Sequence, residues 1–177
     1  PSVVASVALR GEQLYFVDGQ PGQKGRKLHC LRTETGKAIW AEPVADDAAG
    51  EVLLTEQTLL VLDGPDTVTC MALDEEGRAA KQWSATVRGA VGLPAEPGDR
   101  VLVAGAEGLT ALSVSDGSRA WCAKLPAGAV TGPVVAGSLA AVGTPKGVTV
   151  VGLVDGAVLW SAGDEPVAGS LTRDEDR

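Results

Sequence analysis

Tryptophan recurs along this chain at nearly even spacing, and that spacing limits the possible folds more than any other feature. The four tryptophans are Trp40, Trp83, Trp121 and Trp160, separated by 43, 38 and 39 residues. A period of about 40 residues is typical of repeat architectures, in which each repeat buries its apolar face against its neighbours. The chain is therefore expected to hold four copies of one supersecondary unit.

The residues before each tryptophan follow one pattern, in which an apolar strand leads into a polar pair ending in glycine and then a short strand. The four glycines are Gly36, Gly77, Gly117 and Gly156. Each lies four residues before its tryptophan, except in the second copy, where the separation is six. Glycine supplies the positive φ that tight hairpin turns require. Each copy is therefore expected to end in a β-hairpin, which is longer in the second copy.

Two further strand candidates precede each hairpin, and no segment keeps a helical apolar period over a helical length. Four short strands per copy predict an all-β protein, a β-propeller of four-stranded antiparallel blades. A β-sandwich also has short strands, but it does not explain a tryptophan that returns in one local frame. The expected single propeller segment spans residues 1–177, with blades near the ranges 1–44, 45–88, 89–127 and 128–163.

The Gly-x-x-x-Trp hairpins resemble the PQQ-like propeller repeats of quinoprotein dehydrogenases and of the outer-membrane assembly lipoprotein family. That family's motif is Ala-x-Asp-x-x-x-Gly-x-x-x-Trp. Copy three matches it with Ala111, Gly117 and Trp121, and has Ser113 in place of Asp. The resemblance implies that each tryptophan packs flat between adjacent blades against a turn of the backbone. The four tryptophans and the four turn glycines are then structural docking residues between blades.

The resemblance also bears on function, and two classes follow from it. The first is a non-catalytic binding or scaffold module for a protein partner or ligand, such as an assembly scaffold or the sensor part of a larger bacterial protein. The second is a fragment of a PQQ-dependent quinoprotein dehydrogenase. The compartment is not given by the residues, but the resemblance favours an extracytoplasmic one, whether periplasmic, cell-surface or secreted.

The residues that the dehydrogenase class requires are missing from this chain. In that family the cofactor site resembles a stacked tryptophan, an adjacent cysteine pair, and calcium held by Glu, Asn and Asp. The chain has no asparagine and no adjacent cysteines. We therefore expect no catalytic, cofactor-binding or metal-binding residues, with PQQ and calcium bound only under the second class. His29 and Cys30 cannot form a catalytic pair, because neighbours in a strand point to opposite faces.

Composition excludes several partners. A net charge of −8 disfavours nucleic acid, because an acidic surface repels phosphate backbones. No apolar run reaches the ~18 residues of a membrane-spanning helix.

The three cysteines, Cys30, Cys70 and Cys122, lack the CxxC spacing of zinc and redox sites. They are expected to be buried apolar groups, and one disulfide with one free thiol stays open as an alternative.

The end of the chain suggests an incomplete ring. Residues 165–172 echo residues 132–139, so residues 164–177 are expected to begin a further blade or to form a disordered tail. An open row of blades leaves apolar faces uncovered at both ends. Either the remaining blades of a longer chain cover those faces, or two copies associate as a homodimer that closes an eight-bladed ring. A closed four-bladed ring is a third arrangement, in which the tail would have no use.

Overall fold

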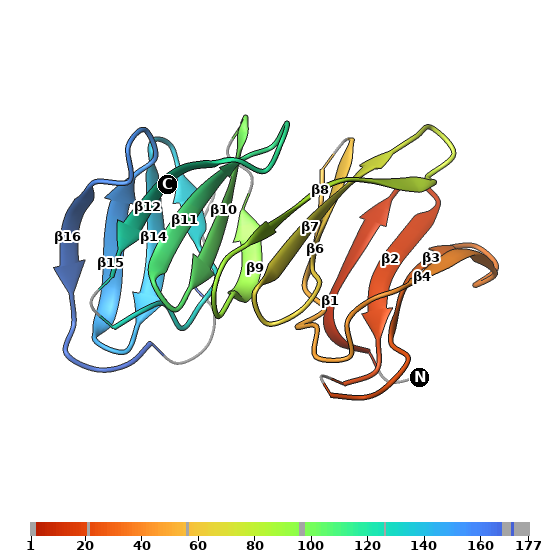
Figure 1. The fold of residues 1–177 in the computed structure, drawn as a ribbon, viewed down its shortest axis with the longest axis horizontal. Coiled ribbons are helices and arrows are strands. Elements are labelled where there is room, and N and C mark those ends of the chain that lie inside the picture. The colour runs from red at the N-terminus through yellow and green to blue at the C-terminus, as the bar shows by residue number, and fades with distance from the viewer. Residues whose placement is uncertain are drawn as a thin grey trace. The chain divides into compact units, whose positions relative to one another are not determined.

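The structure is a computed structural model that describes residues 3–20, 22–55, 57–95, 98–125, 127–167 and 171. These residues form sixteen strands in four antiparallel sheets, each of four strands (Figure 1). Within each sheet the strands lie in the order of the chain. The described residues form no helix, and so none that could span a membrane. The expected all-β class and the four-stranded antiparallel blades are confirmed.

The contacts of the chain divide it into two compact units, and the first, Pro1–Thr86, holds two of the sheets. The strands of the first sheet are β1 (Val3–Arg10), β2 (Gln13–Asp18), β3 (Lys27–Arg32) and β4 (Ala38–Pro43). The strands of the second are β5 (Val52–Leu54), β6 (Thr58–Leu62), β7 (Thr67–Leu73) and β8 (Ala79–Thr86). We call these sheets blade one and blade two.

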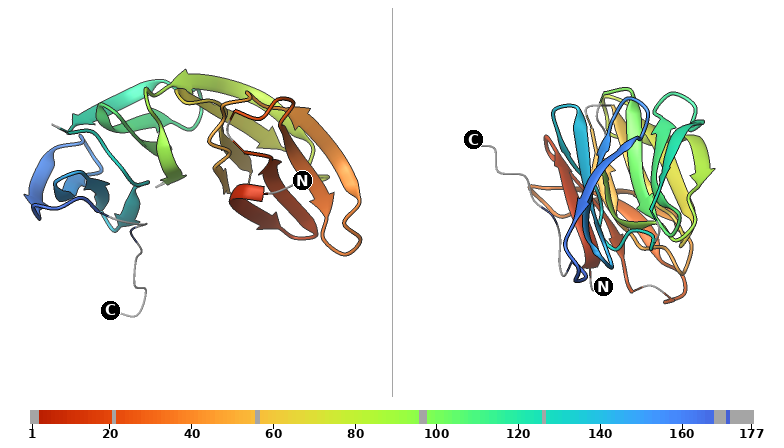
Figure 2. Two further views of the ribbon diagram at one scale, coloured as in Figure 1. Left: turned by 90° about the horizontal axis from the view of Figure 1, so that it is seen from below. Right: turned by 90° about the vertical axis from the view of Figure 1, so that its left-hand side faces the viewer.

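The second unit, Val87–Arg177, holds the other two sheets, which are coloured from green to blue in Figure 2. Blade three consists of β9 (Val91–Ala95), β10 (Arg100–Gly105), β11 (Gly108–Ser113) and β12 (Arg119–Lys124). Blade four consists of β13 (Val134–Ala136), β14 (Leu139–Thr144), β15 (Gly147–Gly152) and β16 (Val158–Ala162).

One irregularity recurs in all four blades and fixes the place of each tryptophan. The third and fourth strands pair so that the tryptophan lies opposite a small or branched residue, and the register then shifts by one residue. These pairs are Cys30 with Trp40, Cys70 with Trp83, Ala111 with Trp121, and Val150 with Trp160. Such a bulge bends the fourth strand and re-aims its side chains.

The longer second hairpin keeps the same register. In blades one, three and four the turn is closed by a glycine amide that donates to a carbonyl four residues earlier, as Gly36 N does to Arg32 O. In blade two, Gly77 N donates to Asp74 O, three residues earlier, and extra pairs such as Leu73 with Ala79 lengthen the ladder. The two added positions between Gly77 and Trp83 therefore lengthen the hairpin without moving the tryptophan from its place.

Each unit has an apolar core between its own two sheets. In the first unit the buried cluster includes Tyr15, Leu28, Leu59 and Val61. In the second unit it includes Leu102, Leu109, Ala140, Val142 and Val151. The second strands are buried on both faces, which is why β6 and β10 are continuous apolar runs instead of alternating ones.

The chain leaves blade four as it leaves blade three. The amide of Ala129 donates to the carbonyl of Gly105, and the amide of Val167 donates to the carbonyl of Thr144, at the same end of the second strand. Residues 168–170 and 172–177 lie outside the described residues, so the expected start of a further blade, or a disordered tail, stays a prediction.

Candidate functional site

The first tryptophan contact joins blade one to the hairpin turn of blade two. Trp40 Nε1 donates a hydrogen bond of 2.8 Å to the carbonyl of Gly77. Beside it, Gln13 Nε2 donates to the carbonyl of Glu76 at 2.7 Å. Gly77 has a φ of 76°, and a Cβ there would collide with the side-chain amide of Gln13. The turn therefore needs glycine both for its backbone and for this close approach.

A buried tyrosine supports this contact from within the core. Tyr15 Oη donates to Gln13 Oε1 at 2.7 Å, and its ring centroid lies 6.0 Å from that of Trp40. Burial, and then the neighbouring Cys30, raises the pKa of Tyr15 to about 12. The phenol is therefore a neutral donor at physiological pH, and it orients the amide of Gln13 toward Glu76.

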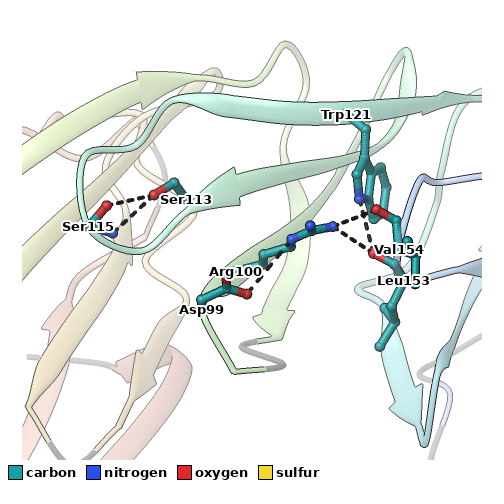
Figure 3. A network of polar contacts seen from close by, with 7 residues as sticks. All are labelled: Asp99, Arg100, Ser113, Ser115, Trp121, Leu153 and Val154. Carbon is teal, nitrogen blue, oxygen red and sulfur yellow. Dashed lines mark hydrogen bonds and ion pairs between the residues drawn. The ribbon is translucent and has the colours of Figure 1, made fainter.

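The second tryptophan contact joins blade three to the hairpin turn of blade four (Figure 3). Trp121 Nε1 donates to the carbonyl of Leu153 at 3.1 Å. Arg100 Nη1 donates to the carbonyls of Leu153 and Val154, both at 2.8 Å. The indole lies against Gly156, where a Cβ would come within 2.5 Å of Cε3.

The two contacts are built from equivalent positions. Gln13 pairs with Arg32 at the start of β2, and Arg100 pairs with Ser113 at the start of β10. Arg32 follows Cys30, the residue paired with Trp40, by two positions. Ser113 follows Ala111, the residue paired with Trp121, by the same two positions. Each dock therefore combines an indole N–H with one polar side chain, and both donate to carbonyls of the next hairpin turn.

The sequence singled out the tryptophans and glycines but missed Gln13 and Arg100. Their sequence signal is a polar residue at the first position of a blade's second strand, where an apolar residue would be expected. This signal can be recognised only once the strand register is known. The same register places Leu139, which pairs with Gly152, at this position in blade four.

The other two tryptophans differ sharply in exposure. Trp83 is buried, with 8% of its surface exposed, whereas 52% of the surface of Trp160 is exposed. Gly36 and Gly117 occupy the same turn position as Gly156, with φ values of 65° and 71°. Nothing lies within 4 Å of a Cβ built on Gly36, in contrast to the filled position at Gly156.

His29 and Cys30 have separate surroundings, as expected for neighbours in a strand. His29 stacks on Phe16 with centroids 5.1 Å apart, and its Nε2 lies 2.9 Å from Asp18 Oδ2. Burial pushes the pKa of Asp18 upward, but hydrogen bonds from Lys27 N and His29 outweigh it and hold that pKa below its usual value. Cys30 is buried on the Tyr15 side, and burial raises the pKa of its thiol.

All three cysteines are free thiols, so the single-disulfide alternative is not seen. Within the described part of the chain, no three His, Cys, Asp or Glu side chains gather where they could hold a metal ion.

The two docked tryptophans are already engaged by the backbone of the neighbouring blade. Trp40 and Trp121 are engaged by turn backbone through their N–H groups, and the ring of Trp121 lies against Gly156. The cysteines that could form a pair are separated along the chain, and the sequence has no asparagine. At these two docks, therefore, neither indole is free to stack on a cofactor.

Blade one and blade two also border an open crevice of about 360 Å³. Its lining mixes both signs of charge, with Arg10, Arg32, Glu12, Glu75 and Glu76. Several of these groups already have partners, since Arg10 Nη1 donates to the carbonyl of Asp74 at 3.3 Å and Arg32 lies 3.7 Å from Glu12. The crevice lies over the first dock, and its lining also includes Gln13 and the exposed side chain of Ile39.

Sequence comparison matches the chain to one family model. The model described as outer membrane protein assembly factor BamB matches residues 2–89 and 71–176, which together cover nearly the whole chain. No curated protein sequence matches the chain.

Solved structures share the fold at low sequence identity. BamB from Moraxella catarrhalis is 19% identical, with a TM-score of 0.73 over 90% of this chain and 49% of that one. The computationally designed Ika4 protein is 11% identical, with a TM-score of 0.71 over 86% of this chain and 91% of that one. The quinohemoprotein alcohol dehydrogenase ADHIIG from Pseudomonas putida HK5 is 14% identical, with a TM-score of 0.68 over 93% and 34%. These likenesses show the fold alone, and the chain spans about half the length of the Moraxella protein.

Proposed function

The chain belongs to the PQQ-like β-propeller repeat family described as outer membrane protein assembly factor BamB, and we propose on that basis that it is a non-catalytic propeller module that binds or scaffolds a protein partner. The exposed indole of Trp160 is the observation that carries this proposal. It occupies the frame in which Trp40 and Trp121 dock onto backbone, yet 52% of its surface is exposed. A large apolar side chain that is held in a docking frame, and whose N–H no residue in the described part of the chain binds, is suited to contact with a protein partner.

The chemistry of the described side chains supports binding over catalysis. The perturbed groups Tyr15 and Asp18 serve structural hydrogen bonds, and burial raises the pKa of the neighbouring Cys30 thiol, which disfavours the reactive thiolate. We propose that the chain binds neither PQQ nor calcium, and that its compartment is extracytoplasmic, as in an outer-membrane assembly system. Fractionation of cells that make the native protein tests the compartment, and recovery in the cytosol would contradict it.

A titration separates this proposal from the dehydrogenase class. The protein is titrated with PQQ in the presence of Ca²⁺ while the absorbance of the quinone is followed, with a quinoprotein dehydrogenase as the positive control. We expect no saturable change with this chain. Saturable binding of the quinone would overturn the non-catalytic proposal.

Photocrosslinking tests the protein-binding part of the proposal. A photoreactive amino acid replaces Leu139, which holds in blade four the register position that Arg100 holds in blade three, and the matched control carries it at the exposed Lys24. We expect protein adducts from position 139 in extracts of the native cells, and none from position 24. Equal labelling at both positions, or none at either, would contradict a binding surface around Trp160.

A further inference from the structure

The outermost strand of blade four has an edge that the described residues leave unpaired. β16 (Val158–Ala162) is the last strand of its sheet and pairs only with β15 (Figure 1). In the part of the chain that the structure describes, no backbone hydrogen bond outside this sheet involves its residues. An antiparallel edge strand turns half of its amide and carbonyl groups away from its single neighbour, so β16 has free donors and acceptors along one side.

β16 lacks the residues that protect the outer strands of the other three blades. β4 ends in Glu42 and Pro43, β8 carries Lys81, and β12 carries Arg119 and Lys124. Charged side chains and proline on an edge strand keep other strands from pairing with it. The sequence of β16 contains neither a charged residue nor a proline, so its edge is open to another strand.

The strand register locates the difference at one position, two residues before the tryptophan. Blades two and three have Lys81 and Arg119 there, and blade four has Val158. An exposed charge is therefore replaced by an apolar side chain that is 49% exposed.

Two more exposed apolar side chains follow Val158. Leu159 is 53% exposed and Trp160 is 52% exposed. We call these three consecutive residues the β16 strip. Branched and aromatic side chains of this kind pack well against the side chains of a neighbouring strand.

A blade that follows another covers the tryptophan of its outer strand but not the two residues before it. Blade two follows blade one, yet the two residues before Trp40 are exposed. Blade four follows blade three, yet the two residues before Trp121 are exposed. Val158 and Leu159 hold the equivalent positions, so they and the free edge of β16 stay accessible whether or not the chain continues into another blade.

We propose that β16 binds an extended, uncharged segment of a partner protein, which adds to blade four as a fifth strand. The backbone of the segment pairs with the free groups of β16, and its alternate apolar side chains pack against the β16 strip. In this mode of recognition main-chain hydrogen bonds supply affinity and side chains supply specificity. The inference rests on the proposed function, the binding of a protein partner, and names the form in which the partner binds.

The size of the edge favours an extended segment over a second folded copy. β16 has 5 residues and is therefore about 17 Å long. Two folded copies that meet only along such an edge bury far less than the about 1,200 Å² of a stable protein interface. An extended segment follows the strand and also lies over the β16 strip, so it uses both the backbone groups and the apolar side chains.

Fluorescence anisotropy with a defined peptide tests the proposal. The probe is a short labelled peptide of alternating valine and threonine. The control peptide has proline at two neighbouring central positions, which blocks pairing along both of its edges. We expect saturable binding of the probe to the wild-type chain, and no binding of the proline peptide.

Two variants separate the edge from its surroundings. Val158→Lys introduces the kind of charge that blades two and three carry at this position, and it should weaken binding of the probe by about tenfold or more. Val154→Lys is the matched control, because Val154 is 79% exposed in the turn before β16. It should bind the probe as the wild type does.

Hydrogen exchange followed by NMR, residue by residue, reports where the peptide pairs. The outward amides of β16 should exchange more slowly with the probe bound, and those of the charged edge of β12 should not change. Absence of saturable binding, equal binding by Val158→Lys, or binding without slower exchange in β16 would overturn the proposal.

Two further outcomes are distinct. Self-association that slows exchange in β16 without any peptide would assign the edge to a second copy and would also overturn the proposal. If the probe does not bind but position 139 still crosslinks a protein, this inference fails while the proposed function stands.

Discussion

A Cβ on Gly156 would lie 2.5 Å from Cε3 of the Trp121 indole, so glycine at this position makes room for the ring to pack against the turn. Gly156 also has a φ of 72°, a region that side chains with a Cβ adopt at a cost. Gly156 is therefore required for two reasons, the positive φ of the turn and the close approach of the indole. Only the first reason applies to the equivalent Gly36, because nothing lies within 4 Å of its Cβ position.

Comparing Gly156→Ala with Gly36→Ala separates the two demands. Both substitutions should lose about 1–2 kcal/mol of unfolding free energy through the positive φ. Gly156→Ala should lose about 1–3 kcal/mol more, because the methyl group displaces the indole from a packed contact. Chemical denaturation at concentrations where the chain is monomeric measures both losses. Equal losses would show that the indole moves aside without cost.

Trp121→Ala should destabilise the second unit far more than Trp160→Ala. Trp121 packs on the turn of blade four and donates to Leu153 O, so its removal should cost about 3–5 kcal/mol, as for other large-to-small core changes. Trp160 is half exposed, and its removal from the monomer should cost less than about 1 kcal/mol. The unfolding midpoints of the two variants in denaturant provide the measurement. Similar midpoints would contradict the docking role of Trp121.

Arg100→Met should weaken the same dock through its polar part. The substitution keeps the apolar stem and removes the donor to the carbonyls of Leu153 and Val154. Hydrogen bonds from a charged donor contribute about 1.5–3 kcal/mol, so a loss of that order is expected. Arg119→Met is the matched control, since Arg119 is exposed on β12. If Arg100→Met loses no more unfolding free energy than Arg119→Met, the indole of Trp121 alone stabilises this contact.

Tyr15 should make the first unit sensitive to alkali. Its pKa is about 12 in the folded chain against 10.0 for the free group, so the folded state binds the proton more tightly. The corresponding stability is complete below pH 10 and is lost as the pH rises from 10 toward 12, by about 2–3 kcal/mol in all. Tyr15→Phe should therefore lose less stability than the wild type between pH 9 and 12.

The phenolate absorbance provides a direct reading of the same effect. Tyr15 is the single tyrosine of the chain, so the ultraviolet titration reports this residue without overlap from others. The transition should lie near pH 12 in the folded protein and return to about 10 in denaturant. A folded-state midpoint near 10 would place the hydroxyl in water, contrary to its contact with Gln13.

The repeat itself was predictable because its signals are local. A hairpin turn needs glycine at a given offset, and the tryptophan follows within a few residues, so Gly117 and Trp121 mark a hairpin in any context. The strand pattern is also local, since β-strands alternate over two residues. The second hairpin illustrates the limit, because the spacing of Gly77 and Trp83 suggested a displaced tryptophan whereas the register restores its position.

The amino-acid sequence by itself determined the class of fold, the number of blades and the residues that repeat, because turn chemistry and strand alternation act over a few neighbours. Only the tertiary structure decided which carbonyl each indole meets, that Gln13 and Arg100 share that task, and that Trp160 is left exposed. These contacts join residues more than 30 positions apart, as Trp40 and Gly77 do, and they depend on how one sheet packs on the next. No local pattern specifies that packing, because the same hairpin motif is filled at Gly156 and empty at Gly36.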